Sequence, residues 1–304
     1  NRSSPYISFS RDDRKDDLIN IFAQDKIALS PKELYLTLGS KFEHNDFTGF
    51  EYEPSARLSW LVDDKQTLWG AVSRAVRNPN IGLDDIQFLV STLSPSVMAG
   101  RVGDKNAQSE NLISYEIGYR VEPTPNTSLD VSTFYNDYEQ LILGVQGTAF
   151  LTTTSLGSYF VAPVYPVNAG STTSYGFETT AKWSPTTYAQ LSASYSYLQL
   201  KFDQPDPFGF SFNGKSPRHQ FNVRSAIQLP HDVEFDTSLY FVDNLSRLAI
   251  PQYTRLDTKL SWKALENVEL SLVGQNLLDG NHPEFTGFLY QAQSEIPRSV
   301  YGNI

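Results

Sequence analysis

Apolar and polar side chains alternate along many short segments of this chain. The alternation is clearest over 111–121, where one row opposes the other: Ile113, Tyr115, Ile117, Tyr119 and Val121 against Ser114, Glu116, Gly118 and Arg120. Successive side chains of a β-strand point to opposite faces, so each segment has one apolar and one polar face. The segments 33–43, 127–143, 217–229 and 252–262 behave alike, whereas the pattern does not assign the faces of 18–29 and 66–77.

The pattern predicts about fourteen strands. Their expected positions are 5–10, 18–29, 33–43, 51–62, 66–77, 111–121, 127–143, 158–167, 173–183, 187–200, 217–229, 233–243, 252–262, 267–278 and a terminal 297–304, of which 158–167 also reads as loop.

The connections between these strands alternate in length. The short ones lie at 30–32, 63–65, 122–126, 184–186, 230–232 and 264–267, and the long ones at 44–50, 78–110, 144–172, 201–216, 244–251 and 279–296. Tight turns at one rim and long loops at the other are typical of a transmembrane β-barrel. A soluble all-β module also has hairpins, but its loops need not sort by length.

Aromatic residues gather beside the short connections. Trp60 and Trp69 flank 63–65, Trp183 and Tyr188 flank 184–186, and Trp262 precedes 264–267. Amphipathic rings favour the headgroup region of a membrane, so these positions favour an aromatic girdle at one rim. The alternative is turn-adjacent core packing in a soluble sandwich.

Composition narrows the function classes. The 304 residues carry a net charge of −10 and no cysteine. An acidic chain without basic clusters is a poor nucleic-acid binder, and no stretch approaches the ~18 apolar residues of a membrane helix. The sequence has no Ser-His-Asp spacing, no metal-ligand cluster and no cofactor motif. We therefore predict no catalytic residue, no metal and no cofactor. An enzyme site near the rim could be assembled from Glu43, His44, Asp46, His282 and Glu284, but no motif spacing supports it.

Several short motifs follow one another in a defined order. They are 73–79 with Arg74, Arg77 and Pro79; 109–111; 115–120 with Glu116 and Gly118; 176–178; 216–219; 253–257 with Asp257; 274–279 with Asn276 and Leu277; and 296–301 with Pro297 and Arg298. In this order and spacing the chain resembles the TonB-dependent outer-membrane receptors, in the C-terminal part of their β-barrel. The resemblance covers nearly the whole chain, and the named residues are its expected structural positions.

The resemblance implies an all-β fold. Residues 1–304 would form one partial domain, about the last fourteen strands of an antiparallel transmembrane barrel of roughly 22 strands, with the plug domain outside this chain. The implied location is the outer membrane of a Gram-negative bacterium, in contact with its lipid. The implied function is energised uptake of a ferric siderophore or similar small chelate, driven by a TonB-type inner-membrane transducer that engages an N-terminal part not present here. A passive porin-like or adhesin-type barrel is the alternative.

Ligand contacts are expected in the long external loops. Exposed aromatic and cationic loop side chains suit a large anionic chelate. The candidates are Arg101, Tyr159, Phe160, Tyr165, Phe208, Phe210, Phe212 and Arg247. Loop-on-loop packing and simple solvation are the competing interpretations. Haem is not expected, because the four histidines are scattered and 82–110 contains none.

Overall fold

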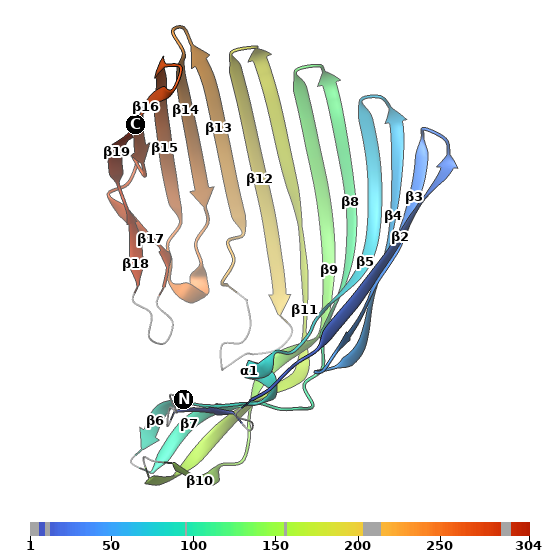
Figure 1. Ribbon diagram of the computed structural model, residues 1–304, viewed down its shortest axis with the longest axis vertical. Helices are drawn as coiled ribbons and strands as arrows, with labels where there is room; N and C mark the ends of the chain where they lie inside the picture. Colours follow the sequence, from blue (N-terminus) through green and yellow to red (C-terminus); the bar gives the residue numbers. More distant parts are fainter. Residues whose placement is uncertain (1–5, 10–12, 95, 155–156, 203–213, 287–292) are drawn as a thin grey trace.

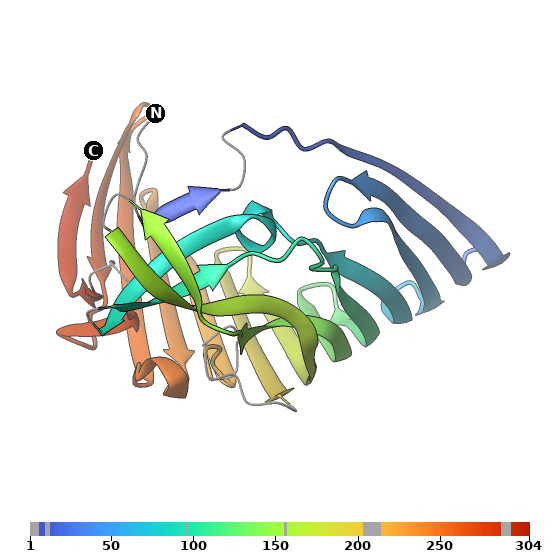
Figure 2. The ribbon, with the colours of Figure 1, turned by 90° about the horizontal axis from the view of Figure 1, so that it is seen from below.

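The computed structural model describes residues 6–9, 13–94, 96–154, 157–202, 214–286 and 293–304. Most of them form antiparallel strands of one curved sheet, called here the wall (Figure 1). In spatial order the wall contains β2 (Leu18–Ser30), β3 (Leu34–Asn45), β4 (Gly49–Asp63), β5 (Gln66–Arg77), β8 (Glu110–Thr124), β9 (Thr127–Gln146), β11 (Gly157–Thr186), β12 (Ala189–Phe202), β13 (His219–Leu229), β14 (Val233–Val242), β15 (Tyr253–Leu265), β16 (Val268–Gln275) and β19 (Ser299–Asn303). Seen from below, it is an arc with β2 and β19 at its ends (Figure 2).

The predicted short connections all lie at one rim of the wall, at the top of Figure 1. They are two or three residues long and span 31–33, 64–65, 125–126, 187–188, 230–232 and 266–267. Lys32, His231 and Asp232 adopt positive φ in two of these turns, a conformation that several types of tight turn use. The expectation that these six connections are tight turns at one rim is therefore confirmed.

One connection predicted to be long is short. The prediction for 44–50 was wrong, because β3 runs to Asn45 and β4 begins at Gly49. The side-chain Oδ1 of Asn45 accepts hydrogen bonds from the backbone N–H groups of Phe47 and Thr48, both at 2.9 Å. An Asx turn of this kind reverses the chain within three residues.

Two other predicted loops build a separate structure, the rim lobe, at the bottom of Figure 1. Residues 78–110 contain α1 (Ile81–Asp84), β6 (Ile86–Ser94) and β7 (Val97–Val102), and residues 144–172 contain β10 (Phe150–Thr154) and the first part of β11. In the lobe β1 (Ile7–Phe9) pairs with β6, β6 with β7, and β7 runs parallel to β11, which also pairs with β10. Reading these segments as loops was wrong, whereas the strand at 158–167 is confirmed.

The last long connection is also partly regular. Residues 279–296 were expected to be loop, but β17 (Asn281–Phe285) pairs with β18 (Ser294–Pro297) in a two-stranded arm. The terminal strand predicted over 297–304 is accordingly shorter, since β19 begins at Ser299.

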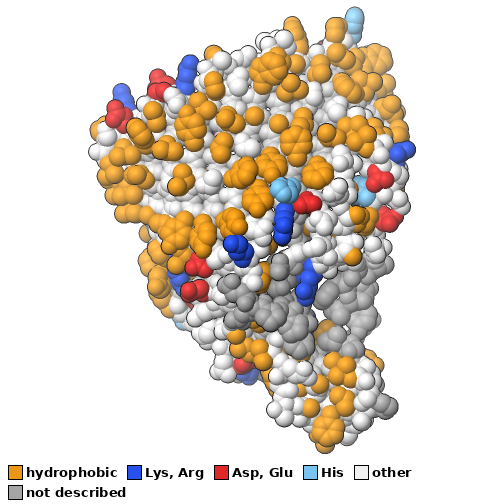
Figure 3. Space-filling model, turned by 180° about the vertical axis from the view of Figure 1, so that it is seen from behind, with side chains coloured by type: hydrophobic (Ala, Val, Ile, Leu, Met, Phe, Trp, Pro, Cys, Tyr) orange, Lys and Arg blue, Asp and Glu red, His pale blue; other side chains and the backbone are white. Residues whose placement is uncertain are grey.

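The convex face of the wall is apolar (Figure 3). Leu58, Ile117 and Leu260 are 44%, 62% and 44% exposed there, as expected of side chains that meet lipid. Strand pairing now assigns the two faces that the sequence pattern left open: Ile27 lies beside Leu36, and Val72 beside Ala56, on this same side.

The four tryptophans do not share one face. Trp60, Trp183 and Trp262 are about half exposed on the apolar side near the short turns. Trp69 pairs with Ser59 rather than with Trp60, so its ring lies on the opposite, concave face. There the guanidinium carbon of Arg57 lies 4.5 Å from the ring centroid, and the ring covers Gly118, where a Cβ would overlap it. Placing Trp69 in the girdle was therefore wrong, and Gly118 is explained by the close approach of this ring.

Candidate functional site

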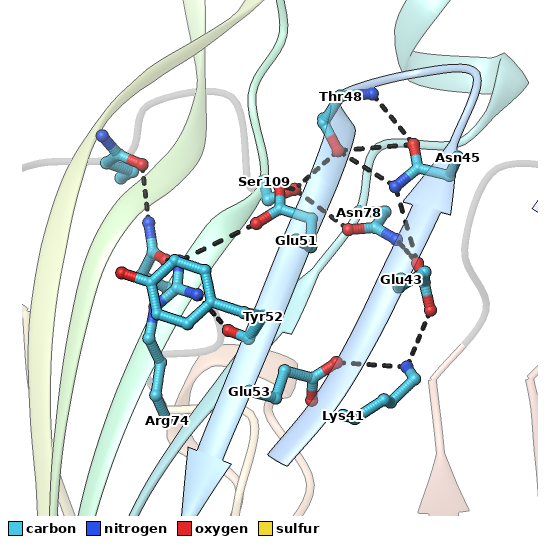
Figure 4. A network of polar contacts seen from close by, with 12 residues as sticks. Lys41, Glu43, Asn45, Thr48, Glu51, Tyr52, Glu53, Arg74, Asn78 and Ser109 are labelled. Carbon is cyan, nitrogen blue, oxygen red and sulfur yellow. Dashed lines mark hydrogen bonds and ion pairs between the residues drawn. The ribbon is translucent and has the colours of Figure 1, made fainter. Parts of the chain in front are cut away.

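A polar network joins the ends of β3, β4, β5 and β8 at the rim opposite the short turns (Figure 4). We call it the rim network. Its members are Lys41, Glu43, Asn45, Thr48, Glu51, Tyr52, Glu53, Arg74, Asn78 and Ser109.

Glu43 is the most enclosed acid of the network. It is 5% exposed and pairs with Lys41, whose Nζ lies 2.7 Å from its Oε2. The same Nζ lies 3.1 Å from Oε1 of Glu53, and the side-chain amide of Asn78 donates to Oε1 of Glu43. A buried carboxylate is costly unless it is paired and hydrogen-bonded, and here both conditions are met. Lys41 and Asn78 therefore hold β3, β4 and the segment after β5 together.

Arg74 forms the second centre of the network. Its guanidinium lies 4.7 Å from the ring centroid of Tyr52, donates to the backbone carbonyl of Tyr52 and to Asn111, and lies 3.8 Å from Glu51. Ser109 Oγ is within hydrogen-bond distance of Asn78, Thr48 and Glu51. Arg74 therefore fixes the end of β5 against β4 and β8, which gives a structural reason for its place in the sequence motif.

Arg77 and Pro79, the other named positions of that motif, lie directly beyond it. Arg77 forms an ion pair with Glu110, which is 5% exposed. Oε1 of Glu110 also accepts the backbone N–H of Ile142 at 2.8 Å, so this carboxylate links β5, β8 and β9. Pro79 is buried, and Asn80 then caps α1 through a 2.9 Å bond from the N–H of Gly82. Farther along β8, Glu116 accepts from Ser114 at 3.3 Å.

A separate polar cluster surrounds the end of β16. Asp257 accepts from Arg255 at 2.9 and 2.7 Å and from the backbone N–H of Asn276 at 2.9 Å. Asn276 is fully buried with φ 52°, and its Nδ2 donates to the carbonyl of Ile296 at 3.0 Å. The next residue, Leu277, packs against Gly274. These bonds end β16 and hold the β17–β18 arm to the wall.

The arm is held at two further points. The ring of His282, 4% exposed, stacks on Tyr253 with centroids 4.1 Å apart, and its Nε2 lies 3.1 Å from Glu284. Arg298 donates from its backbone N–H to Gly280 and from Nε to the carbonyl of Asp279, at 2.9 and 3.0 Å. Pro297, the last residue of β18, pairs with Asn281.

The predicted ligand residues are distributed over different parts of the molecule. Arg101 lies in β7 beside Val164, and Phe160 is 48% exposed on the rim lobe. Tyr159 is 7% exposed and belongs to the core of that lobe, which matches the packing interpretation. Tyr165 covers Gly147, whose Cβ would overlap its ring.

The remaining candidates lie elsewhere. Arg247 lies in a short 3-10 helix (Ser246–Leu248), where its N–H donates to the carbonyl of Gly214 at 3.0 Å. Phe208, Phe210 and Phe212 fall outside the described residues. Ligand contact by all eight residues stays a prediction.

Asn45, Ser109 and Glu110 are buried members of these clusters. Sequence reasoning missed Asn45, whereas Ser109 and Glu110 belong to the motif at 109–111, to which it assigned no partners. The available signal for Asn45 was its position as a polar residue at a strand end, next to a turn. Their partners come from other strands, and only the register reveals them.

The rim lobe has a hydrophobic core of its own, so it should be able to unfold while the wall remains folded. Val161 is 0% exposed and packs with Leu89, Met98 and Tyr159. Val161→Asp buries an unpaired carboxylate and should unfold the lobe. Limited proteolysis should then cut within 86–102, while the wall remains folded. Phe160→Asp, on the exposed side of the same strand, should leave the lobe protected; equal cleavage of both variants would contradict this account.

Comparisons with known proteins agree with this architecture. The family model described as TonB dependent receptor-like, beta-barrel matches residues 1–277. The iron-regulated outer membrane virulence protein of Vibrio cholerae is 23% identical over 273 residues, covering 85% of this chain and 40% of that protein. The ferric enterobactin receptor of Pseudomonas aeruginosa is 24% identical over 153 residues, covering 49% of this chain and 20% of that protein.

Solved structures show the same fold. The siderophore receptor PirA from Acinetobacter baumannii superposes with a TM-score of 0.76 at 14% identity, over 97% of this chain and 46% of that one. A variant of the receptor PfeA from Pseudomonas aeruginosa, in complex with enterobactin, gives 0.71 at 17% identity, over 94% and 45%. This chain thus spans less than half the length of these relatives. Among the described residues, no helix is long and apolar enough to cross a membrane.

Proposed function

This chain belongs to the TonB-dependent receptor family, in its β-barrel domain, and on that premise we propose that it serves the energised uptake of a ferric siderophore. Its relatives are outer-membrane receptors of Gram-negative bacteria, and the outer membrane is its location. The family consists of transport receptors rather than enzymes. The observation that carries the proposal is the family match over 1–277, together with relatives named as siderophore receptors.

In this proposal residues 1–304 act as one barrel domain that binds and conducts but performs no chemistry. The rim lobe and the arm, at the rim opposite the short turns, face the outside and meet the ferric chelate. A plug domain of the whole receptor gates the path, and a TonB-type transducer moves that plug. The concave face of the wall carries charged side chains, among them Arg120, Asp130, Glu178 and Lys182. It suits such a path, since these carboxylates and cations can contact water or a polar protein domain instead of lipid.

Growth and uptake measurements test the proposal. A deletion strain under iron limitation should fail to grow on at least one ferric siderophore of a panel, and the intact gene should restore growth. Uptake of radiolabelled iron from that siderophore should stop when a protonophore is added, while binding to cells on ice persists. Uptake that continues with the protonophore would indicate a passive porin-like barrel. Unchanged growth on every siderophore would point to a different ligand.

A further inference from the structure

The apolar convex face of the wall is hollowed near the short-turn rim. A groove of about 490 Å³ lies over β3, β4, β5 and β8, and its lining includes Leu58, Trp60, Leu68, Gly70 and Ile117. A second groove of about 600 Å³ shares three of these residues and extends the first past Val72 to Tyr115. We call the two together the outer groove.

Gly70 forms the floor of the outer groove. Its neighbours in the pairing are Leu58 on β4 and Ile117 on β8, and both side chains are exposed, so they form the two sides. A Cβ at Gly70 would meet only the backbone oxygen of Glu116, at 3.6 Å, so packing within the wall does not demand glycine here. Glycine weakens the interior of a strand, and it often marks a site where a ligand approaches closely. The hollow above Gly70 is therefore suited to a molecule outside the wall.

The length of the outer groove matches one leaflet of a bilayer. From Leu68 near the rim to Val72 at the far end, β5 advances four residues, or about 13 Å. The hydrocarbon core of a bilayer is about 30 Å thick, so one leaflet contributes about 15 Å. Tyr115 lies beside Val72, and its ring is paired with that of Tyr135, with the centroids 6.5 Å apart. An acyl chain that enters from the short-turn rim therefore ends at these two rings.

The width of the outer groove selects a single chain over a helix. β4 and β8 flank β5, so the backbones that carry Leu58 and Ile117 are about 9–10 Å apart. The two side chains themselves occupy part of that width. An α-helix with its side chains is about 10–12 Å across and cannot reach the floor, whereas a hydrocarbon chain can.

Charges of both signs lie at the rim end of the outer groove. Of the six short turns, only 31–33 and 64–65 contain lysine, and these are the turns that border the groove. Lys32 and Lys65 are exposed, and neither forms an ion pair within the described part of the chain. Glu33 and Asp64 adjoin them in the same turns, and Figure 3 shows basic and acidic side chains together at the upper left edge of this face. The rim end thus offers cations to a phosphate and carboxylates to an ammonium group.

We propose that the outer groove binds a phospholipid of the phosphatidylethanolamine type from the periplasmic leaflet, with one acyl chain over Gly70. Its phosphate contacts Lys32 and Lys65, and its ammonium group contacts Glu33 and Asp64. An anionic phospholipid without an ammonium group would leave these carboxylates facing its phosphate. The inference uses the orientation of the proposed function, with the short turns toward the periplasm, and is independent of the transported chelate.

The test titrates lipids into the full-length receptor after purification from the outer membrane and removal of bound lipid by detergent exchange. Native mass spectrometry counts the lipid molecules that each receptor retains. Phosphatidylethanolamine should bind about tenfold more tightly than a diacylglycerol with the same chains, because only the first makes charge-assisted headgroup contacts. Gly70→Leu fills the floor of the groove and should weaken phosphatidylethanolamine binding about tenfold, the effect of losing roughly two methylene contacts.

Two further variants make the result specific. Gly302→Leu is the matched control, since it makes the same substitution on the same convex face, where a Cβ also meets only one backbone oxygen at 3.6 Å, but on β19. It should bind phosphatidylethanolamine as the unmodified receptor does. Lys32→Ala combined with Lys65→Ala should remove the preference over diacylglycerol, and this variant tests the site even if Gly70→Leu does not fold.

Equal binding by the unmodified receptor, Gly70→Leu and Gly302→Leu would overturn the inference, because the groove would then not be the binding site. Equal affinity for phosphatidylethanolamine and diacylglycerol would overturn it as well, since the charged turns would then play no part. Co-purification of a protein that Gly70→Leu releases would show that the groove is a docking face for a partner instead. None of these measurements involves iron, so growth of the deletion strain on every siderophore would refute the proposed function alone.

Discussion

Replacing Gly176 with alanine should abolish assembly of the folded wall. Gly176 lies in the centre of β11, paired with Phe134 on β9 and Leu198 on β12. A Cβ at this position would overlap the backbone carbonyl oxygen of Tyr197. Because that oxygen belongs to a strand paired along its whole length, it cannot rotate away as a side chain would. We expect a destabilisation above about 4 kcal/mol, in the range of severe overpacking.

The measurement is the heat-dependent shift in gel mobility of the protein in outer-membrane fractions, which reports the folded form. Gly280→Ala is the matched control, because a Cβ there meets no heavy atom within 4 Å. Gly118→Ala should have an intermediate effect, since its overlap is with the side chain of Trp69, which can shift. Normal amounts of folded Gly176→Ala protein would show that β12 yields and would refute this explanation.

Local patterns predicted the strands and the short turns of the wall. Alternation over 111–121 and turn residues such as those at 230–232 act within a few positions, so a single sequence contains the necessary information. The rim lobe could not be predicted in this way. Its central contact is a parallel pairing of 97–101 with 160–164, and no local pattern specifies which distant segment a short strand will join.

The face of Trp69 and the rim network show a second limit. In β5, Leu68 and Val72 lie on one face and Trp69 and Ala71 on the other, so both rows are apolar and the pattern is ambiguous. In the network, Lys41, Glu43 and Glu53 share a site only because β3 and β4 pair in one register. The sequence motifs included Arg74 and Asn276, but they did not show which residues these two side chains contact. Their partners, Tyr52 and Ile296, follow from the three-dimensional structure alone.

Asn276→Ala should release the β17–β18 arm from the wall. The substitution removes the bond from Nδ2 to the carbonyl of Ile296 and leaves that carbonyl without its partner in a buried site. It also places alanine at φ 52°, a conformation that asparagine tolerates better. The two effects together should cost about 3 kcal/mol. Backbone amides of 281–285 and 294–297 should then exchange with deuterium much faster, whereas those of β14 and β15 should not change.

Asn276→Gly separates the two causes. Glycine adopts positive φ freely, so this variant loses only the side-chain bond and should fall between the wild-type protein and Asn276→Ala, at about 1–2 kcal/mol. If both variants exchange alike, the side-chain bond alone holds the arm and the backbone conformation contributes nothing. If both match the wild-type protein, the arm is instead held through the stacked rings of His282 and Tyr253 and the bonds of Arg298. The order of the three proteins therefore decides whether the asparagine in this motif serves as a turn residue, a hydrogen-bond donor, or both.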